Sequence, residues 1–421
     1  NKLESVMIIK VTDLPYEEAI NREWKHHNPV MPSKILKCLI NLLSKSELKA
    51  VDFTYVNHDM ERLSDDEPCL ILMNHSSFID LKIAEHIFSK RPLSIVCTSD
   101  GFIGKEWLMR HLGCIPTQKF VQDIHLVKDL DYALHTLKSS VLMFPEASYS
   151  FDGTATPVPK SVAKCIKFLG VPVVMIRTHG AFLRDPLYNN LQLRDVKVSA
   201  EAKYLLSPED ISNISVQEID DILLKEFSFD NFKEQQDNHI SVTEAFRADY
   251  LNRVLYKCPH CMTEGQMQGS GTSLICKNCG ITYELNEFGY LESASPRFAH
   301  VPDWYKWQRD EVKKEIEEGN YKLDVEVDIC VLTDAKSIYH VGEGVLHHDI
   351  DGFRLTGCDG KLDYSQSPKA SYSLYSDYYW YEIGDMVCIG NKKMLYYCFP
   401  KDKSIDIAAK TRLAVEEMYK L

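Results

Sequence analysis

The stretch that decides the fold is Ile71-Leu72-Met73-Asn74-His75-Ser76-Ser77-Phe78-Ile79-Asp80. Its apolar start predicts the end of a buried strand, and residues 79–88 predict the helix that follows. Ser76 or Ser77 can cap this helix, which leaves His75 on the strand-to-helix turn and Asp80 in the first turn. Asp80 can then reach one imidazole nitrogen of His75 and fix its tautomer, so the other nitrogen faces a cleft as a general base. We expect backbone N–H groups at the helix start to stabilise a developing oxyanion.

A histidine followed five residues later by an aspartate is a weak signal when it stands alone. The chain has 15 histidines, so about one such pair is expected by chance. A buried histidine with an ordinary partner is therefore the alternative reading of His75. The segments around it decide between the two.

Short apolar strands alternate with helices across residues 52–206. Strands are expected at 69–73, 94–97, 141–144 and 171–176, and helices at 79–88, 106–112, 125–137 and 160–169. This alternation predicts an α/β fold with a mixed, mostly parallel sheet flanked by helices. Functional groups are then expected on the loops that follow the strands.

Four blocks in this region resemble the motifs of the glycerophospholipid acyltransferase family, whose best-known members acylate lysophosphatidate. The first block is Asn74-His75-x4-Asp80, and the second is a glycine, Gly113, followed six residues later by the basic Lys119. The third motif, Phe-Pro-Glu-Gly-Thr-Arg in the family, stands here as Phe144-Pro145-Glu146-Ala147-Ser148-Tyr149. The fourth, an apolar stretch around Val-Pro, is Val171-Pro172-Val173-Val174.

The resemblance implies an acyltransferase that forms no covalent acyl-enzyme. His75 would deprotonate an acceptor hydroxyl, which attacks the thioester carbonyl of acyl-CoA or acyl-carrier protein, and Asp80 would orient His75. The acceptor would be a lyso-lipid or a related alcohol, as in the 1-acylglycerol-3-phosphate acyltransferases of phospholipid biosynthesis. The acceptor-binding residues that the resemblance implies are Asn74, Lys119, Glu146, Ser148 and Tyr149.

The third block departs from the family pattern at two positions. Ala147 replaces a glycine, and Tyr149 replaces the arginine that helps hold the acceptor's phosphate. A tyrosine hydroxyl carries no charge and offers no bidentate fork. We therefore expect lysophosphatidate to be a poor acceptor, compared with neutral or zwitterionic alcohols. If it proved a good one, Arg177 just beyond the fourth block would be the first candidate for the missing charge.

Two cysteine pairs follow this region, Cys258-Pro259-His260-Cys261 and Cys276-Lys277-Asn278-Cys279. Their spacing predicts a four-cysteine zinc ribbon within residues 251–296. Four thiolates leave no open coordination position, so the Zn²⁺ would be structural. A disulfide pair or a redox motif is the alternative. We expect the ribbon to form a small core of its own.

The chain is expected to divide into an acyltransferase domain over 1–250, the ribbon, a linker helix over 297–320 and a β-rich domain over 321–421. Apolar and acidic residues alternate from Leu323 to Val331, as in a half-buried strand. Several further β runs follow, at 338–346, 352–356, 370–375, 378–383, 386–389 and 394–399. With a closing helix from about residue 405, this pattern resembles a pleckstrin-homology domain in topology.

Composition limits the partners. The net charge of −13 argues against nucleic-acid binding that rests on overall charge. No apolar run is long enough for a transmembrane helix, and the 13 cysteines indicate a reducing, cytoplasmic compartment. Residues 32–50 carry leucines and isoleucines at helical spacing among lysines, which predicts peripheral contact with the inner face of the cell membrane. Packing of this helix on its own domain is the favoured alternative.

Two classes of function remain. The intact pair of His75 and Asp80 favours an enzyme. The altered third block favours an acyltransferase-fold adaptor that has lost turnover and binds membrane or protein partners. A thioesterase is disfavoured, because the chain has no Gly-x-Ser-x-Gly elbow.

Overall fold

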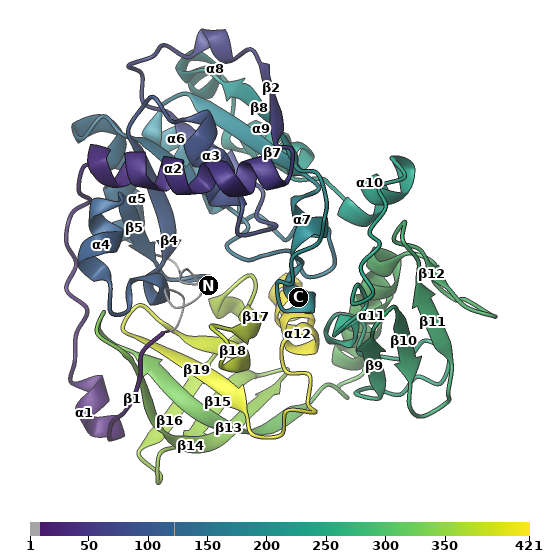
Figure 1. The fold of residues 1–421 in the computed structure, drawn as a ribbon. Helices are drawn as coiled ribbons and strands as arrows, with labels where there is room; N and C mark the ends of the chain where they lie inside the picture. The colour runs from purple at the N-terminus through teal and green to yellow at the C-terminus, as the bar shows by residue number, and fades with distance from the viewer. Residues whose placement is uncertain (1–8, 122) are drawn as a thin grey trace.

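A seven-stranded mixed sheet carries the His75 turn in the computed structural model, which describes residues 9–121 and 123–421 (Figure 1). The strand order is β2-β8-β7-β3-β6-β4-β5, and every neighbouring pair is parallel except β7 and β8. The strands are β2 (Thr54–His58), β3 (Leu70–Met73), β4 (Leu93–Thr98), β5 (Cys114–Thr117), β6 (Ser140–Met143), β7 (Val173–His179) and β8 (Ser199–Leu206). The predicted α/β fold with a mixed, mostly parallel sheet is confirmed.

Helices cover both faces of this sheet. The helices of this part of the chain are α2 (Lys34–Ala50), α3 (Asp80–Ile87), α4 (Glu106–His111), α5 (Ile124–Asp131), α6 (Ser161–Leu169), α7 (Ala181–Arg184), α8 (Pro208–Asn213), α9 (Val216–Glu226) and α10 (Asn231–Asp237). Of these, α10 packs against the segment with the cysteine pairs instead of the sheet. A π-helical turn (Tyr132–Thr136) follows α5, and single 3₁₀ turns occupy Met60–Arg62, Ser99–Phe102, Leu187–Asn189 and Leu251–Arg253.

The apolar run of β3 is explained by burial on both sides. Leu70 and Leu72 pack into the core beneath α6 and α9, whereas Ile71 and Met73 pack into the core beneath α2 and α3. Successive side chains of a strand point to opposite faces, so all four must be apolar when both faces are covered.

The sequence pattern missed three strands of this sheet, β2, β5 and β8. Every residue of β2 is exposed, so this edge strand carries no apolar signal. β8 alternates between buried and exposed residues, and β5 is short and contains Pro116. Strands of these kinds lack the continuous apolar run by which the central strands were found.

A small antiparallel sheet in the order β12-β11-β10-β9 contains the cysteine pairs. Its strands are β9 (Met267–Ser270), β10 (Ser273–Cys276), β11 (Thr282–Leu285) and β12 (Leu291–Glu292). Tyr283 packs against Trp304 of α11 (Val301–Glu317), with their ring centroids 4.8 Å apart. The same core continues to Phe182 of the first domain and to Leu413 near the chain end. The expectation that this segment has a small core of its own is therefore wrong.

The last hundred residues form a β-rich antiparallel domain with a C-terminal helix, as predicted. The strand order is β16-β15-β14-β13-β19-β18-β17. The elements are β13 (Leu323–Leu332), β14 (Ile338–Asp349), β15 (Gly352–Gly357), β16 (Leu362–Gln366), β17 (Tyr375–Trp380), β18 (Gly384–Asn391), β19 (Met394–Pro400) and α12 (Ala409–Lys420), with a 3₁₀ turn at Pro368–Ala370. The strands expected at 370–375 and 378–383 are replaced by β17 alone, and β16 was missed. The resemblance to pleckstrin-homology domains stays a prediction.

The N-terminal segment belongs to this last sheet. Strand β1 (Val11–Asp13) pairs in parallel with β14, and helix α1 (Tyr16–Ile20) follows it, before the chain crosses to α2 on the first domain (Figure 1). The two domains also touch directly, because the Tyr375 hydroxyl donates to Asp100 Oδ2 at 2.6 Å and the Ser371 hydroxyl to the Phe120 carbonyl at 3.0 Å. Strand β17 thus faces the loops that follow β4 and β5.

Candidate active site and metal centre

The turn between β3 and α3 brings His75 and Asp80 together. His75 Nδ1 lies 3.1 Å from Asp80 Oδ2, and the same oxygen accepts the backbone N–H groups of Ser76 at 2.8 Å and Ser77 at 3.0 Å. Asp80 is fully buried, whereas the His75 side chain keeps 15% of its surface exposed. One carboxylate therefore fixes both the turn and the imidazole.

The backbone groups at the helix start are used differently from the prediction. The N–H groups of Ser76 and Ser77 point at Asp80, so they do not face an oxyanion in the cleft. The helix begins at Asp80 itself and has no side-chain cap, although the Ser77 hydroxyl accepts the N–H of Ile79 at 3.1 Å. The serine cap is therefore corrected, and the amides of Ser76 and Ser77 are removed from the predicted oxyanion site, because the Asp80 carboxylate accepts both.

Two aromatic rings hold the imidazole of His75 between them. The ring centroid of His75 lies 4.0 Å from that of Phe144 and 3.9 Å from that of Tyr149, and both pairs are stacked. Its Nε2 makes no hydrogen bond with any residue that the structure describes. Burial lowers the pKa of His75, the hydrogen bond and charge of Asp80 partly offset this, and the charge of Lys119 lowers it further. The imidazole is consequently neutral near pH 7, with Nε2 free to accept a proton.

Glu146 connects the third block to the His75 turn. Its Oε2 accepts the backbone N–H of His75 at 3.0 Å, and its Oε1 accepts that of Thr156 at 2.7 Å. The side chain is fully buried, and this burial raises the pKa of Glu146 to about 7. Both carboxylate oxygens are therefore engaged with backbone groups that shape the site.

Asn74 is buried between β3 and β7. Its Oδ1 accepts the backbone N–H of Thr178 at 2.9 Å, and its amide donates to the hydroxyls of Thr178 at 3.1 Å and Ser76 at 3.2 Å. The side chain ties together the ends of two neighbouring strands. Its predicted contact with substrate stays a prediction.

Lys119, beyond β5, packs against the C-terminal domain. Its Nζ lies 4.3 Å from the ring centroid of Tyr375, a distance typical of a cation–π contact. Burial lowers the pKa of Lys119, and the charges of Asp377 and Asp100 partly offset this. Burial also raises the pKa of Asp377 to about 7. The second block thus meets residues that the sequence did not connect with it.

Two further contacts in the site escaped the sequence analysis. The hydroxyl of Ser77 donates to the buried carboxylate of Asp185, and burial raises the pKa of Asp185 to about 7. Arg412 of α12 donates from Nη1 to the hydroxyl of Ser148 at 3.2 Å. No motif spacing could reveal a partner 264 residues away. Arg177, by contrast, lies over the ring of Phe229 at 5.9 Å.

The four cysteines of the two pairs converge. Their sulfur atoms all lie within 4.8 Å of one another, with 3.8 Å between Cys258 and Cys279 and 3.6 Å between Cys261 and Cys276. A tetrahedral zinc ion with Zn–S distances of about 2.3 Å separates its sulfur ligands by roughly 3.8 Å. The cluster therefore fits a zinc ion held by Cys258, Cys261, Cys276 and Cys279.

Ala147 generates the first prediction, because it adopts a left-handed backbone conformation with φ of 54° where the family has glycine. This conformation costs an L-residue roughly 1–2 kcal/mol, and glycine removes that cost. Glycine also raises the conformational entropy of the unfolded chain, which lowers the free energy of unfolding by about 0.4–1 kcal/mol. Ala147→Gly should raise the free energy of unfolding by up to about 1 kcal/mol in urea titrations. The matched control is Ala84→Gly in the middle of α3, which should lower it by about 1 kcal/mol or more. Destabilisation by Ala147→Gly would contradict the strain.

The second prediction concerns the metal. Protein purified without oxygen should contain about one zinc per chain by elemental analysis, because four thiolates at tetrahedral spacing bind zinc tightly. Cys276→Ser/Cys279→Ser should lose the zinc and lower the melting temperature of the whole chain, since the ribbon shares its core with α11 and α12. The control Cys38→Ser/Cys165→Ser should keep it. Wild-type protein free of tightly bound metal would refute the site.

Comparison with known proteins gives a match to a protein family and a likeness to a solved structure. Residues 55–178 match the family model described as Acyltransferase. Among solved structures, the crystal structure of the 1-acyl-sn-glycerophosphate (LPA) acyltransferase PlsC from Thermotoga maritima is similar to 46% of this chain and 78% of that one, with 17% identity and a TM-score of 0.36. No curated protein matches the chain. The family match spans His75, Asp80, Lys119 and Tyr149, so it supports, at the family level, an acyltransferase.

Proposed function

We propose that the protein transfers a fatty acyl chain from acyl-CoA or acyl-carrier protein to a hydroxyl group of a lyso-lipid or related acceptor. The observation that carries this proposal is the state of His75. Asp80 holds Nδ1, two rings hold the imidazole plane, and Nε2 has no partner among the described residues. A neutral imidazole fixed in this way can act as a general base that takes a proton from an acceptor hydroxyl.

The arrangement of His75 supports the following reaction. The acceptor hydroxyl gives its proton to His75 Nε2 while its oxygen attacks the thioester carbonyl. The tetrahedral intermediate then collapses, the carbon–sulfur bond breaks, and the departing thiolate takes the proton from His75. An ester and a free thiol result, with no covalent acyl-enzyme. Asp80 stabilises the imidazolium that exists between the two proton transfers.

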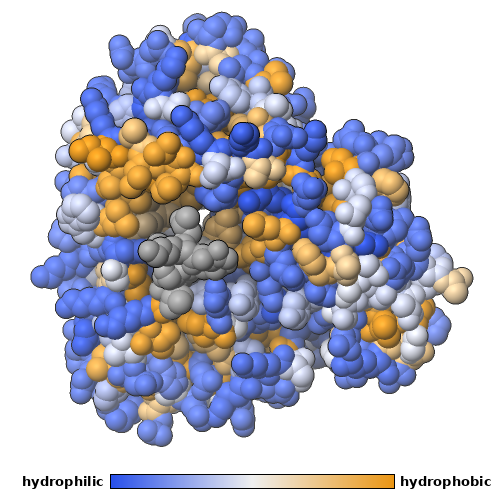
Figure 2. Space-filling model, in the orientation of Figure 1, coloured by the Kyte–Doolittle hydropathy of each residue, from blue (hydrophilic) through white to orange (hydrophobic). Residues whose placement is uncertain are grey.

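The surface of α2 suits a protein that takes its lipid acceptor from a membrane. One face of this helix packs on α3, with Leu48 buried and Lys37 paired to Glu85 at 3.6 Å. The other face exposes large apolar side chains, among them Ile35 at 81% and Leu42 at 63%. Figure 2 draws this face as an apolar patch over α2. The helix therefore packs on its own domain and still offers an apolar face.

This apolar surface extends from α2 to α4. Leu39, Leu43 and Met31 are also exposed, and Trp107 of α4 is 67% exposed. The N–H of Ser33 before α2 donates to the carbonyl of His111 at the end of α4, which brings the two helices together. A patch of this kind suits the interfacial region of a bilayer. Peripheral contact with the inner face of the cell membrane, made through residues 32–50, is part of the proposal. Among the described residues, no helix is long and apolar enough to cross a membrane.

The adaptor alternative keeps the membrane contact but lacks turnover. It predicts that His75→Ala leaves the rate of acyl transfer unchanged, because the wild-type protein already has none. The enzyme is the better supported of the two, because the His75–Asp80 pair is assembled and a free Nε2 has no structural use.

His75→Ala should lower acyl transfer by about 10²–10⁴-fold, the usual contribution of a general base. Asp80→Asn should cost less, because the geometry survives but the tautomer preference is lost. The measurement is transfer of radiolabelled palmitoyl groups from palmitoyl-CoA to lyso-lipids by purified protein, with circular dichroism to verify folding. His135→Ala is the matched control, since His135 and Asp131 form a similar pair at 2.9 Å on the surface. A wild-type rate of acyl transfer by His75→Ala would contradict the mechanism.

The same variants give a pH dependence. The base must be unprotonated, and burial places the pKa of His75 below the ordinary value of 6.5. The acid limb of kcat/KM should therefore have its midpoint below 6.5, and Asp80→Asn should move it lower still, because the carboxylate favours the imidazolium. A limb near pH 7 that disappears in Glu146→Gln would instead assign the titration to Glu146.

The membrane contact predicts that Leu39→Glu/Leu42→Glu weakens binding to vesicles of phosphatidylglycerol and phosphatidylcholine by roughly tenfold or more in co-sedimentation. Each buried leucine side chain contributes about 1.5–3 kcal/mol, and about 1.4 kcal/mol is a factor of ten. Leu193→Glu/Leu224→Glu, which changes two equally exposed leucines elsewhere, should bind as wild type does. Equal binding by all three proteins would exclude α2 as the contact.

A further inference from the structure

The C-terminal helix reaches the third block of the candidate active site. Arg412 of α12 donates from Nη1 to the hydroxyl of Ser148 at 3.2 Å, and its guanidinium carbon lies 4.6 Å above the ring centroid of Phe151. Arg412 and Ser148 are each only 3% exposed. A buried guanidinium group therefore lies beside Ser148. The next residue, Tyr149, occupies the position at which the family carries its arginine.

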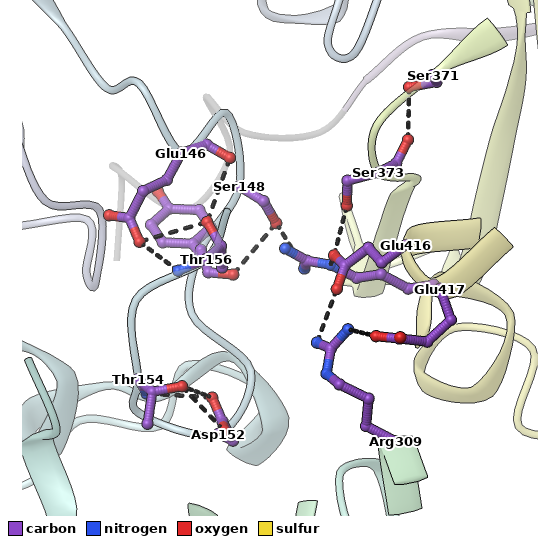
Figure 3. Close-up of polar contacts among 12 residues, drawn as sticks. Glu146, Ser148, Asp152, Thr154, Thr156, Arg309, Ser371, Ser373, Glu416 and Glu417 are labelled. Atoms are coloured by element: carbon purple, nitrogen blue, oxygen red, sulfur yellow. Dashed lines mark hydrogen bonds and ion pairs between the residues drawn. The ribbon is translucent and has the colours of Figure 1, made fainter. Parts of the chain in front are cut away.

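Buried contacts hold this arginine in place. Arg412 donates from Nε to Glu416 Oε1 at 3.2 Å, and the same oxygen accepts the hydroxyl of Ser373 at 2.6 Å. The other oxygen of Glu416 lies 2.7 Å from Nη2 of Arg309, whose Nη1 donates to Glu417 at 3.0 Å. Figure 3 shows this chain of contacts, from Ser148 through Glu416 to Arg309. The direction of the guanidinium is thus set before any ligand arrives.

Lys119 shares the electrostatic environment of Arg412. The charge of Arg412 contributes to the lowered pKa of Lys119 and opposes the burial that raises the pKa of Glu146, so its field reaches both residues. Lys119 is held by the ring of Tyr375 in β17, an element of the same C-terminal domain. The charge of Lys119 in turn acts on His75, so a cation from each domain lies within electrostatic range of the site, and Arg412 contacts the third block directly through Ser148. The charge of Asp377 also acts on Lys119, and burial raises the pKa of Asp377 to about 7.

Tyr149 has a different task from the arginine it replaces. Its ring stacks on the imidazole of His75 and fixes the plane of the base. The family's third motif uses one position for a cation, whereas here that position serves His75. A cation is nevertheless present, because α12 supplies it.

We propose that Arg412 takes the place of the missing motif arginine and, with Lys119, binds the anionic phosphate of the lyso-lipid acceptor. The inference rests on the proposed acyl transfer and names the acceptor class for that site. It replaces the expectation that lysophosphatidate is a poor acceptor, since that expectation counted only cations inside the four blocks. The C-terminal domain then determines acceptor specificity by forming the second wall of the site.

The experiment is competitive transfer from palmitoyl-CoA to lysophosphatidate and monoacylglycerol at equal concentration. Arg412→Gln should lower the ratio of kcat/KM for lysophosphatidate over monoacylglycerol by about 10- to 100-fold, the usual effect of a lost charge-assisted hydrogen bond. Arg412→Lys should retain part of the preference, because it keeps the charge but not the fork. The control is Arg354→Gln, an exposed arginine of the same domain paired with Asp363, which should leave the ratio unchanged.

A rescue separates charge from structure. Tyr149→Arg added to Arg412→Gln should restore the ratio, because it returns a cation to the motif position. It should lower kcat for both acceptors, since the ring on His75 is lost. A ratio that stays low in this double variant, or an equal loss for both acceptors in Arg412→Gln and Arg412→Lys, would overturn the proposal.

The phosphate groups of the palmitoyl-CoA donor are a second candidate ligand of Arg412, because they carry the same kind of charge as the acceptor's phosphate. The assay is therefore repeated with the palmitoyl thioester of N-acetylcysteamine, which has no phosphate. A loss that appears only with palmitoyl-CoA would assign Arg412 to the donor and overturn the acceptor assignment. If wild-type protein transfers to neither acceptor, the proposed function fails. Calorimetric binding of short-chain lysophosphatidate then tests Arg412 directly, and equal affinity of wild type and Arg412→Gln would overturn its role.

Discussion

The carboxylate of Asp80 is the constraint on which the site depends. It lies fully buried at the start of α3 and accepts two backbone N–H groups as well as the imidazole of His75. Three donors on Oδ2 offset much of the cost of burying this carboxylate, whereas Oδ1 has no hydrogen-bond partner among the described residues. The turn, the tautomer of His75 and the direction of Nε2 are therefore consequences of one group. The rings of Phe144 and Tyr149 and the carboxylate of Glu146 then fix the plane and the backbone of the same histidine.

Much of the first domain was predictable because its central strands are buried on both faces and read as apolar runs. The motif residues His75, Asp80, Glu146 and Tyr149 follow such strands, and the fold brings them together. The edge strands were missed because β2 is wholly exposed and carries no apolar pattern. Two of the amides near the helix start, those of Ser76 and Ser77, are unavailable to an oxyanion for a local reason, since Asp80 accepts both.

The part of the site that the sequence did not reveal comes from far along the chain. Arg412, Tyr375 and Asp377 belong to a domain whose residues carry no motif, and their relation to the third block exists only in the folded chain. A pattern search can detect the absence of an arginine at position 149, but it cannot find a guanidinium that enters from another domain. Local motifs therefore predict the contact between His75 and Asp80, but not the contact of Arg412 with Ser148.

The pairing of β1 with β14 has a consequence for how the protein reaches its active form. Val11 lies opposite Ile338 in this ladder, so the chain must close a loop of most of its length before the last sheet is complete. Long-range closure is slow compared with the formation of local α/β contacts. The His75 turn rests on local and neighbouring-strand contacts, whereas the wall that carries Arg412 requires the later sheet. A partly folded chain would thus form the His75–Asp80 pair before α12 reaches the third block, and the acceptor recognition proposed for Arg412 would form last.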